Sequence, residues 1–251
     1  MATSLNNLAL VHRQRGAYAE ARPLLERALT IYEKTRGPAH PFVATALNNL
    51  AFVCTRLGEA EQAESLFKRS IEVCEKALGP EHPEVASALN NLAHVHQARG
   101  DNAEALELCL RALHIYEKAL GPDHPNVAVS LNNIAVLLLD LGADARAVPL
   151  CERALAITER AYGPDHPNFA QSLHNLASLY AFQGDYARAE PLQRRALIVF
   201  ASKIGPQHPH MHVIHSRYEK ILLGLGKSQS EISEAMEDLF RQIPPAPSEK
   251  G

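Results

Sequence analysis

Apolar residues recur along this chain at helical spacing, and the pattern itself repeats every 42 residues. Leu-Asn-Asn-Leu-Ala begins at Leu5, Leu47 and Leu89, and close variants begin at Leu131 and Leu173. A fixed period of this length indicates a repeat array, in which each unit contacts mainly its neighbours. The pattern therefore predicts one elongated all-α domain rather than a chain divided into separate globular folds.

Glycine and proline mark the same places in every period. Gly-Pro-x-x-Pro turns carry a histidine before the second proline, and these histidines are His40, His82, His124, His166 and His208. A second glycine recurs at 16, 58, 100, 142, 184 and 226. Glycine after a helix end and proline at a helix start are the expected asymmetry. Each unit is predicted to contain helix A, a short turn, helix B and a Gly-Pro turn, with repeats at about 1–40, 41–82, 83–124, 125–166, 167–208 and a degenerate 209–243.

The third repeat shows the expected helix A most clearly, and the second shows helix B. Helix A is predicted from about Pro83 to Ala98, with Leu89, Leu92 and Ala93 on one face. The helix B stripe has offsets of 3, 4, 7, 8, 11 and 15, which are typical of an amphipathic helix; its members are Ala63, Leu66, Phe67, Ser70, Ile71, Cys74 and Leu78.

This arrangement resembles the tetratricopeptide repeat. The Leu-Asn-Asn-Leu-Ala core, the Gly-Pro-x-His-Pro turn and the 42-residue period are similar to the kinesin light chain variety, over residues 1 to about 209. The resemblance implies a right-handed superhelical solenoid of antiparallel helix-turn-helix repeats. It also implies a non-catalytic scaffold for protein-protein interaction.

The two ends of the array depart from the repeat pattern. The first repeat lacks its His-Pro start, so we expect either a fragment of a longer protein or self-association through an uncapped N-terminal edge. Near the other end, Ser228 and Glu231 form a capping-box signature. A closing helix is predicted at 229–243, with its apolar face on the fifth repeat. Proline stops it at Pro244, and residues 244–251 are predicted to be a disordered tail.

Composition narrows the classes of function. The net charge is −3, which does not favour a general binder of nucleic acid. No apolar run approaches the ~20 residues that span a bilayer, and no signal peptide is visible, so we expect a cytoplasmic protein that does not bind membranes. Its four cysteines are expected to be reduced and buried.

A helical wheel places the paired asparagines away from the apolar stripe of helix A. The resemblance assigns this face to a concave groove, which we expect to bind an extended peptide or protein segment. The predicted peptide-binding residues are Asn6, Asn7, Arg13, Asn48, Asn49, Phe52, Arg56, Asn90, Asn91, His94, Gln97, Asn132, Asn133, Val136, Leu139, His174, Asn175, Ser178, Phe182, Arg217 and Lys220.

Asparagine is an unfavourable residue within a helix, by up to about 0.7 kcal/mol relative to alanine. An amide can match both the N–H and the C=O groups of a peptide backbone. We therefore interpret the pairs as a ladder for peptide backbone, with apolar and basic pockets that select acidic and aromatic or aliphatic ligand residues. The alternative is that one asparagine of each pair bonds the next repeat.

Other chemistry finds little support in the sequence. The turn histidines lie one repeat apart and are better explained by helix entry than by a metal site. His208, His210, His212 and His215 cluster, but no carboxylate or cysteine accompanies them. We expect no catalytic residues, no metal and no cofactor. An alternative function is a regulatory or sensor segment of a larger signalling protein, in which the array packs against its own effector domain.

Overall fold

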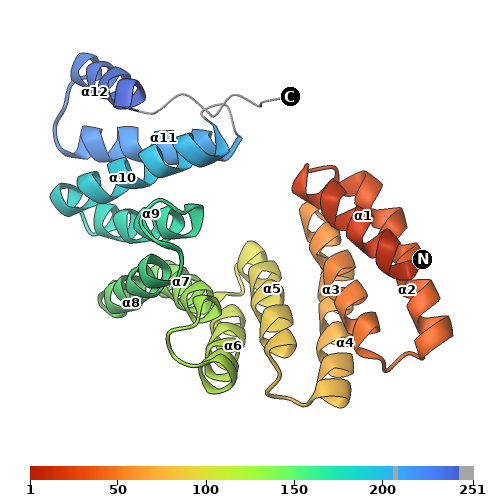
Figure 1. Ribbon diagram of the computed structural model, residues 1–251. Helices are drawn as coiled ribbons and strands as arrows, with labels where there is room; N and C mark the ends of the chain where they lie inside the picture. Colours follow the sequence, from red (N-terminus) through yellow and green to blue (C-terminus); the bar gives the residue numbers. More distant parts are fainter. Residues whose placement is uncertain (206–208, 243–251) are drawn as a thin grey trace. The chain divides into compact units, whose positions relative to one another are not determined.

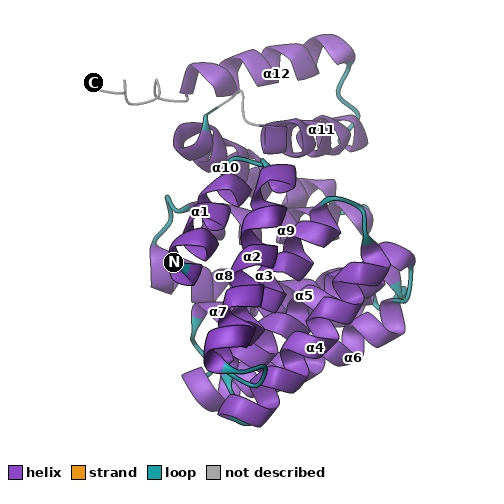
Figure 2. Cartoon of the chain, turned by 90° about the vertical axis from the view of Figure 1, so that its right-hand side faces the viewer, coloured by secondary structure: helices purple, strands orange, loops and turns teal. Residues whose placement is uncertain are grey.

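The computed structural model describes residues 1–205 and 209–242, and every regular element in that part is an α-helix (Figures 1 and 2). The all-α prediction is confirmed. The helices are α1 (Ala2–Gln14), α2 (Tyr18–Arg36), α3 (Pro41–Arg56), α4 (Ala60–Leu78), α5 (Pro83–Arg99), α6 (Asn102–Leu120), α7 (Pro125–Asp140), α8 (Asp144–Tyr162), α9 (Pro167–Phe182), α10 (Tyr186–Ile204), α11 (Pro209–Gly224) and α12 (Gln229–Gln242). Odd-numbered helices are the predicted A helices, and even-numbered ones up to α10 are the B helices.

The histidine of each described Gly-Pro-x-His-Pro turn is the N-cap of the next A helix. Its Nδ1 accepts a hydrogen bond from the backbone N–H two residues further on, and the proline between them occupies the first helical position, where its missing N–H costs nothing. The four donor–acceptor pairs are Phe42 to His40 at 3.1 Å, Glu84 to His82 at 3.2 Å, Asn126 to His124 at 3.1 Å and Asn168 to His166 at 3.1 Å. The helix-entry explanation is confirmed for these four histidines, whereas His208 lies outside the described residues.

Glycine ends the helices because the chain there adopts positive φ. Gly79 follows α4 with φ 96°, and Gly58, in the turn between α3 and α4, has φ 83°. A residue with a side chain would be strained in this conformation. The regular glycines therefore explain why each helix ends at the same point of the period.

The cores contain the predicted Leu and Ala positions of α3, α5, α7 and α9, whereas Leu8 on α1 is 47% exposed. In α5, Leu89 is 1% exposed and Ala93 is 2% exposed, and in α4 Ala63 and Phe67 are 0% and 1% exposed. Alanine at these sites lets neighbouring helices approach closely while leucine and phenylalanine fill the space between them. One member of the predicted stripe differs: Leu78, at the end of α4, is 37% exposed.

The chain divides into two compact units, Met1–Asp123 with α1–α6 (unit 1) and His124–Gly251 with α7–α12 (unit 2). Within each unit, a B helix packs between its own A helix and the next one; α2 and α4 do so in unit 1, and α8 and α10 in unit 2. Each stack therefore has its own continuous core.

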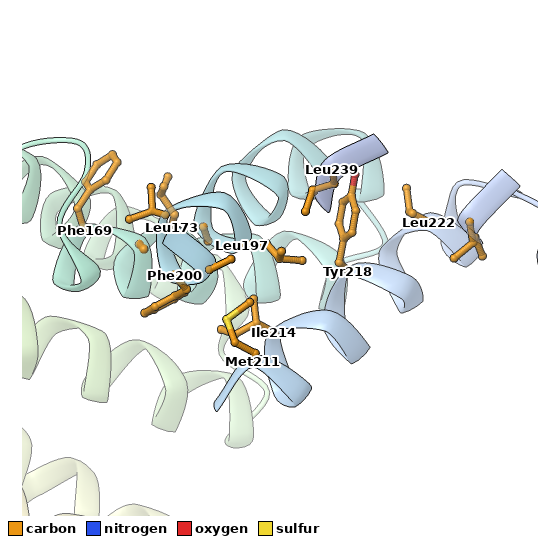
Figure 3. Close-up of a cluster of buried hydrophobic side chains, with 14 residues drawn as sticks. Phe169, Leu173, Leu197, Phe200, Met211, Ile214, Tyr218, Leu222 and Leu239 are labelled. Carbon is orange, nitrogen blue, oxygen red and sulfur yellow. The ribbon is translucent and has the colours of Figure 1, made fainter. Parts of the chain in front are cut away.

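The last helices of unit 2 close its core. Apolar side chains from α9, α10, α11 and α12 gather in one cluster, with Met211, Ile214 and Leu239 at most 2% exposed (Figure 3). Ser228 and Glu231 form the predicted capping box, because the Ser228 N–H donates to Glu231 Oε2 at 2.8 Å and the Glu231 N–H donates to Ser228 Oγ at 3.4 Å. The closing helix thus begins where expected, while Ile243 and the tail 244–251 lie outside the described residues.

Arginines at one repeated position of the B helices join neighbouring repeats. Arg69 pairs with Glu33 and Arg111 pairs with Glu75, in each case on the preceding B helix, and Arg195 reaches Asp165 at 2.8 Å. Exposed pairs of this kind contribute roughly 0.2–1 kcal/mol each. These arginines belong to the scaffold, as their regular spacing suggests.

Candidate functional site

The predicted site residues lie on the A helices, which approach one another within each unit. In the described part of the chain, α3 contacts α5, α7 contacts α9 and α9 contacts α11. Among the even-numbered helices there, only α10 makes a comparable contact with the next one, α12. The A helices therefore form the more closely packed side of each unit. This is the side to which the resemblance assigns the groove.

In unit 1, the paired asparagines bond one another across neighbouring repeats. The Asn49 Nδ2 group donates to Asn6 Oδ1 at 3.0 Å, and Asn91 Nδ2 donates to Asn48 Oδ1 at 3.1 Å. The second asparagine of one pair thus reaches back to the first asparagine of the preceding pair. We call these contacts the amide ladder.

The amide ladder corresponds to the alternative in which one asparagine of each pair bonds its neighbour. Asn49 is 7% exposed and also accepts from the Arg13 guanidinium at 3.3 Å, so it is part of the packed interface between repeats. The amide N–H groups of Asn6 and Asn48 and the Oδ1 of Asn91 are not used by the ladder. Direct contact between these groups and a peptide backbone remains a prediction.

A pocket of about 330 Å³ lies beside the ladder in unit 1. It is lined by side chains from α3, α4 and α5, namely Phe52, Thr55, Arg56, Phe67, Asn91 and His94. The guanidinium of Arg13 lies 4.8 Å from the Phe52 ring centroid, and that of Arg56 lies 5.3 Å from the Tyr18 ring centroid. Cation–π contacts hold both arginines in place without neutralising them. This pocket can take an apolar or aromatic group with an acceptor at its rim.

His94 is less basic than the sequence alone suggests. Desolvation by the surrounding protein lowers the pKa of His94, and a hydrogen bond with Gln97 only partly opposes this. Because the ordinary histidine pKa is about 6.5, the imidazole is neutral at pH 7. His94 therefore presents a hydrogen-bonding ring at neutral pH rather than a positive charge.

The amides of unit 2 bond differently from those of unit 1. Asn132 Nδ2 donates to Ser172 Oγ at 3.3 Å, and Gln171 Nε2 donates to Asn175 Oδ1 at 3.0 Å. Asn132 and Asn175 therefore do not repeat the ladder contact with each other. The regular sequence pattern produces two different hydrogen-bond arrangements.

His174 replaces the first asparagine of its repeat, and a buried glutamine holds it. Gln193 is fully buried; its Nε2 donates to the Ile214 carbonyl at 2.9 Å, which leaves its Oε1 facing His174 Nδ1 at 2.9 Å. Since a glutamine oxygen only accepts, Nδ1 of His174 must carry the proton. The orientation of this imidazole is thus fixed by α10 and α11.

A second pocket, of about 280 Å³, lies in unit 2. Its walls come from α7, α8, α9 and α11 and include Ala135, Val136, Leu139, Asp140, Cys151, His174, Asn175, Ser178, Leu179 and Arg217. Six of these are predicted site residues: Val136, Leu139, His174, Asn175, Ser178 and Arg217. The wall is aliphatic on one side and polar on the other, so it can hold an apolar side chain together with a polar group.

The comparison with known families agrees with the geometry. A family model described as tetratricopeptide repeat matches residues 1–76, 42–101, 84–150 and 144–202. The chain belongs to the tetratricopeptide repeat family. A search of curated proteins finds no match.

Solved structures place this tetratricopeptide repeat protein near the kinesin light chain type. It is 30% identical to a putative kinesin light chain with nearly identical repeats from Podospora anserina, covering 79% of this chain and 94% of that one, with a TM-score of 0.64. BtubC (BKLC) from P. vanneervenii is 25% identical, with coverages of 82% and 81% and a TM-score of 0.67. The STAND protein PH0952 from Pyrococcus horikoshii is 20% identical over 96% of this chain and 35% of its own, with a TM-score of 0.72, and this likeness is one of fold.

Some predicted residues lie outside the pockets, and some pocket residues are missed by the sequence pattern. Phe182, at the end of α9, is 61% exposed, and Lys220 is exposed on α11. A further pocket of about 180 Å³ is lined by Asn6 and Thr45 together with Thr3, Tyr32 and Phe42. The helical wheel misses Tyr32 because it lies on a B helix, and it misses Phe42 because that residue precedes the core motif.

Two other candidates carry no site. The described residues contain no group of three His, Cys, Asp or Glu side chains that could hold a metal ion, and the side chains of His208 and His210 lie outside the described residues. A hollow on α4 is lined by that helix alone, and its Lys68 and Arg69 already pair with Glu64 and Glu33. None of the described helices combines the length and apolar character that a membrane-spanning segment needs.

Proposed function

We propose that this tetratricopeptide repeat protein binds an extended protein segment along the A-helix face of its units. Repeats of this family mediate protein-protein interaction. Binding along the A-helix face is supported by two pockets, of about 330 Å³ in unit 1 and about 280 Å³ in unit 2. Both are lined largely by A-helix side chains. Each has the volume of one or two amino-acid side chains and a mixture of apolar walls and hydrogen-bonding groups.

The asparagines have two roles in this proposal. Asn49 and Asn91 stabilise the stack, whereas the N–H groups of Asn6 and Asn48 are offered to carbonyl groups of the bound segment. The exposed Asn7 side chain is offered in the same way. Specificity then comes from the pockets and not from the amides, because backbone groups are the same in every peptide.

Charge supports binding to acidic segments of protein. Arg56 lines the unit 1 pocket and is exposed, and its guanidinium contacts the Tyr18 ring rather than a carboxylate. On the B helices, in contrast, Arg69, Arg111 and Arg195 pair with Glu or Asp of the protein itself. A carboxylate on the ligand would therefore meet Arg56 without displacing an internal partner.

Selection from a random 12-residue peptide library, followed by fluorescence anisotropy with the best binder, tests this proposal. We expect Phe52→Ala and Arg56→Gln each to weaken binding by about 1 kcal/mol or more, roughly five- to tenfold. Arg27→Gln is the matched control, because Arg27 is an exposed arginine on the B helix α2. Binding that is equally sensitive to Arg27→Gln, or insensitive to all three changes, would contradict the proposed surface.

The same surface suits the alternative role as a sensor segment that packs against another domain. The STAND protein from Pyrococcus horikoshii has a tetratricopeptide repeat sensor. Both roles use the A-helix face, so the variants above also apply to a purified effector domain added in trans. Tight binding of such a domain with no binding of peptides would favour the sensor role.

A further inference from the structure

The unit 2 pocket differs in chemistry from the unit 1 pocket at equivalent repeat positions. Val136 and Ser178 occupy the places of Phe52 and His94, in each case two periods later. The aromatic and imidazole rings of unit 1 are thus replaced by a short aliphatic side chain and a hydroxyl. The unit 2 pocket is therefore expected to take a different ligand group.

Two polar groups in this pocket have no partner within the described part of the protein. Arg217 is half-buried on α11 and makes no ion pair or hydrogen bond with any described residue. The hydroxyl of Ser178 is buried and has no hydrogen-bond partner among the same residues. A buried hydroxyl without a partner is unfavourable, because it has lost its hydrogen bonds to water without replacing them. A ligand acceptor that reached both groups would recover this cost and neutralise the guanidinium.

The acceptor is best matched by a single carboxylate. Arginine binds carboxylates and phosphates through paired N–H groups, and serine adds a third donor. Asp140 also lines the pocket, and its negative charge opposes the second charge of a phosphate more than the single charge of a carboxylate. Val136, Leu139 and Leu179 line the same space and supply an apolar wall beside the donors.

Resting on the proposed function, we propose that the unit 2 pocket binds the side-chain carboxylate of an aspartate or glutamate that lies next to a leucine, isoleucine or valine in the partner segment. The carboxylate bonds Arg217 and Ser178, while the aliphatic neighbour packs on Val136 and Leu139. An internal residue fits an extended segment that continues along the A helices. A chain end would instead stop in the pocket.

Methyl NMR of the full chain tests the proposal with defined probes. N-acetyl-leucyl-glutamyl-amide should shift the methyl signals of Val136 and Leu139 in a saturable manner. The glutaminyl analogue should need about tenfold higher concentration, because it lacks the charge that Arg217 recognises. N-acetyl-leucine, which presents a terminal carboxylate, is the third probe and should bind more weakly than the glutamyl peptide.

Variants identify the groups responsible. Arg217→Gln should remove the difference between the glutamyl and glutaminyl probes, and Ser178→Ala should reduce it. Arg27→Gln, at an exposed position of α2 that lines neither pocket, is the control and should leave the difference unchanged.

The proposal is overturned by equal binding of the two peptides, by no saturable shift, by insensitivity to Arg217→Gln, or by tighter binding of N-acetyl-leucine. A negative result here, combined with library binders that depend on Phe52 and Arg56, would remove this subsite and leave the proposed function standing.

Discussion

The turn histidines act as hydrogen-bond acceptors, through Nδ1, at the start of each described A helix from α3 to α9. Nδ1 of His82 can accept from the Glu84 N–H only while that nitrogen carries no proton. The residue type at this position is therefore explained by backbone chemistry, and not by metal binding. Asparagine or aspartate could perform the same role.

His82→Ala should lower the free energy of unfolding by about 0.5–2 kcal/mol, because it removes an N-cap from α5. His82→Asn should restore most of that loss. Urea unfolding followed by circular dichroism measures both values. Equal stability of the alanine variant and the wild type would show that the proline, and not the histidine, sets the helix start.

His94 should make stability depend on pH in a defined direction. Desolvation lowers its pKa in the folded chain below the unfolded value of about 6.5, so between the two values the unfolded state binds more protons. The contribution of His94 is therefore complete above pH 6.5 and is lost as pH falls through the folded-state value.

Urea unfolding at pH 7.5 and pH 5 checks this dependence in the wild type and in His94→Gln. The wild type should lose more stability on acidification than the variant does. The rest of the chain is the same in both proteins, so only the difference between the two losses is assigned to His94. A larger loss in the variant would mean that the sign is wrong.

Single residues show clearly what a sequence can and cannot predict. The wheel places Phe52, Val136 and Arg217 on the A-helix face, and all three line pockets. It cannot show that Asn49 bonds Asn6, because a wheel gives the direction of a side chain but not its distance from the next helix. Nor can it show the lowered pKa of His94, because desolvation depends on nearby protein atoms that a wheel does not place.

At the scale of helices, the amide ladder links neighbouring A helices of unit 1 by side-chain hydrogen bonds. Asn6, Asn48, Asn49 and Asn91 take part on α1, α3 and α5. Exposed ion pairs between B helices link the same repeats on a different face. Because the ladder is more buried, its hydrogen bonds are screened less by water and should contribute more to the interface.

A double-mutant cycle on Asn48→Ala and Asn91→Ala should give a coupling energy of about 0.5–1.5 kcal/mol in unfolding experiments. The same cycle on Glu75→Ala and Arg111→Ala should give roughly 0.2–1 kcal/mol and should weaken with added salt. A coupling near zero for the asparagines would indicate that they are available to ligand instead. Peptide binding by each single variant then separates the two roles.

Helix boundaries are predictable wherever the sequence contains glycine, proline or capping residues at the turns. The pattern predicts the third helix A from Pro83 to about Ala98, and α5 runs from Pro83 to Arg99. It predicts a closing helix from 229, and α12 begins at Gln229. Proline at the first helical position and the Ser228 capping box allow these helix starts to be predicted from the sequence. Pairing between side chains of different helices has no comparable local signal.

At the scale of the molecule, the 42-residue period continues unchanged across the division between Asp123 and His124. The sequence predicts one array because its pattern contains no break at this point. The two units are distinguished by contacts between helices, which are denser within each unit than between the units. Such contacts depend on side-chain packing and not on the repeat pattern. The described contacts within each unit, and the separate pocket in each, cannot be read from a pattern that is the same in both.

Buried cysteines lie in the cores of both units, and their reactivity reports how well those cores are packed. Cys54, Cys74, Cys109 and Cys151 are all buried and form no disulfides. Burial raises the pKa of Cys54 and Cys74 to about 11 and that of Cys109 and Cys151 to about 12. Since the thiolate is the reactive form, the native chain should react very slowly with a thiol reagent at pH 8.

All four thiols should react promptly in denaturant, and variants that keep one cysteine each should report the opening of individual repeats. Cys151 is the most demanding case, because it lines the unit 2 pocket while being 2% exposed. Cys109, one period earlier and 1% exposed, is its matched control. Similar slow labelling of the two would show that the pocket floor is as well packed as the core. Rapid labelling of Cys151 alone in the native chain would show instead that this pocket opens further than its 280 Å³ and admits larger groups than a carboxylate with an aliphatic neighbour.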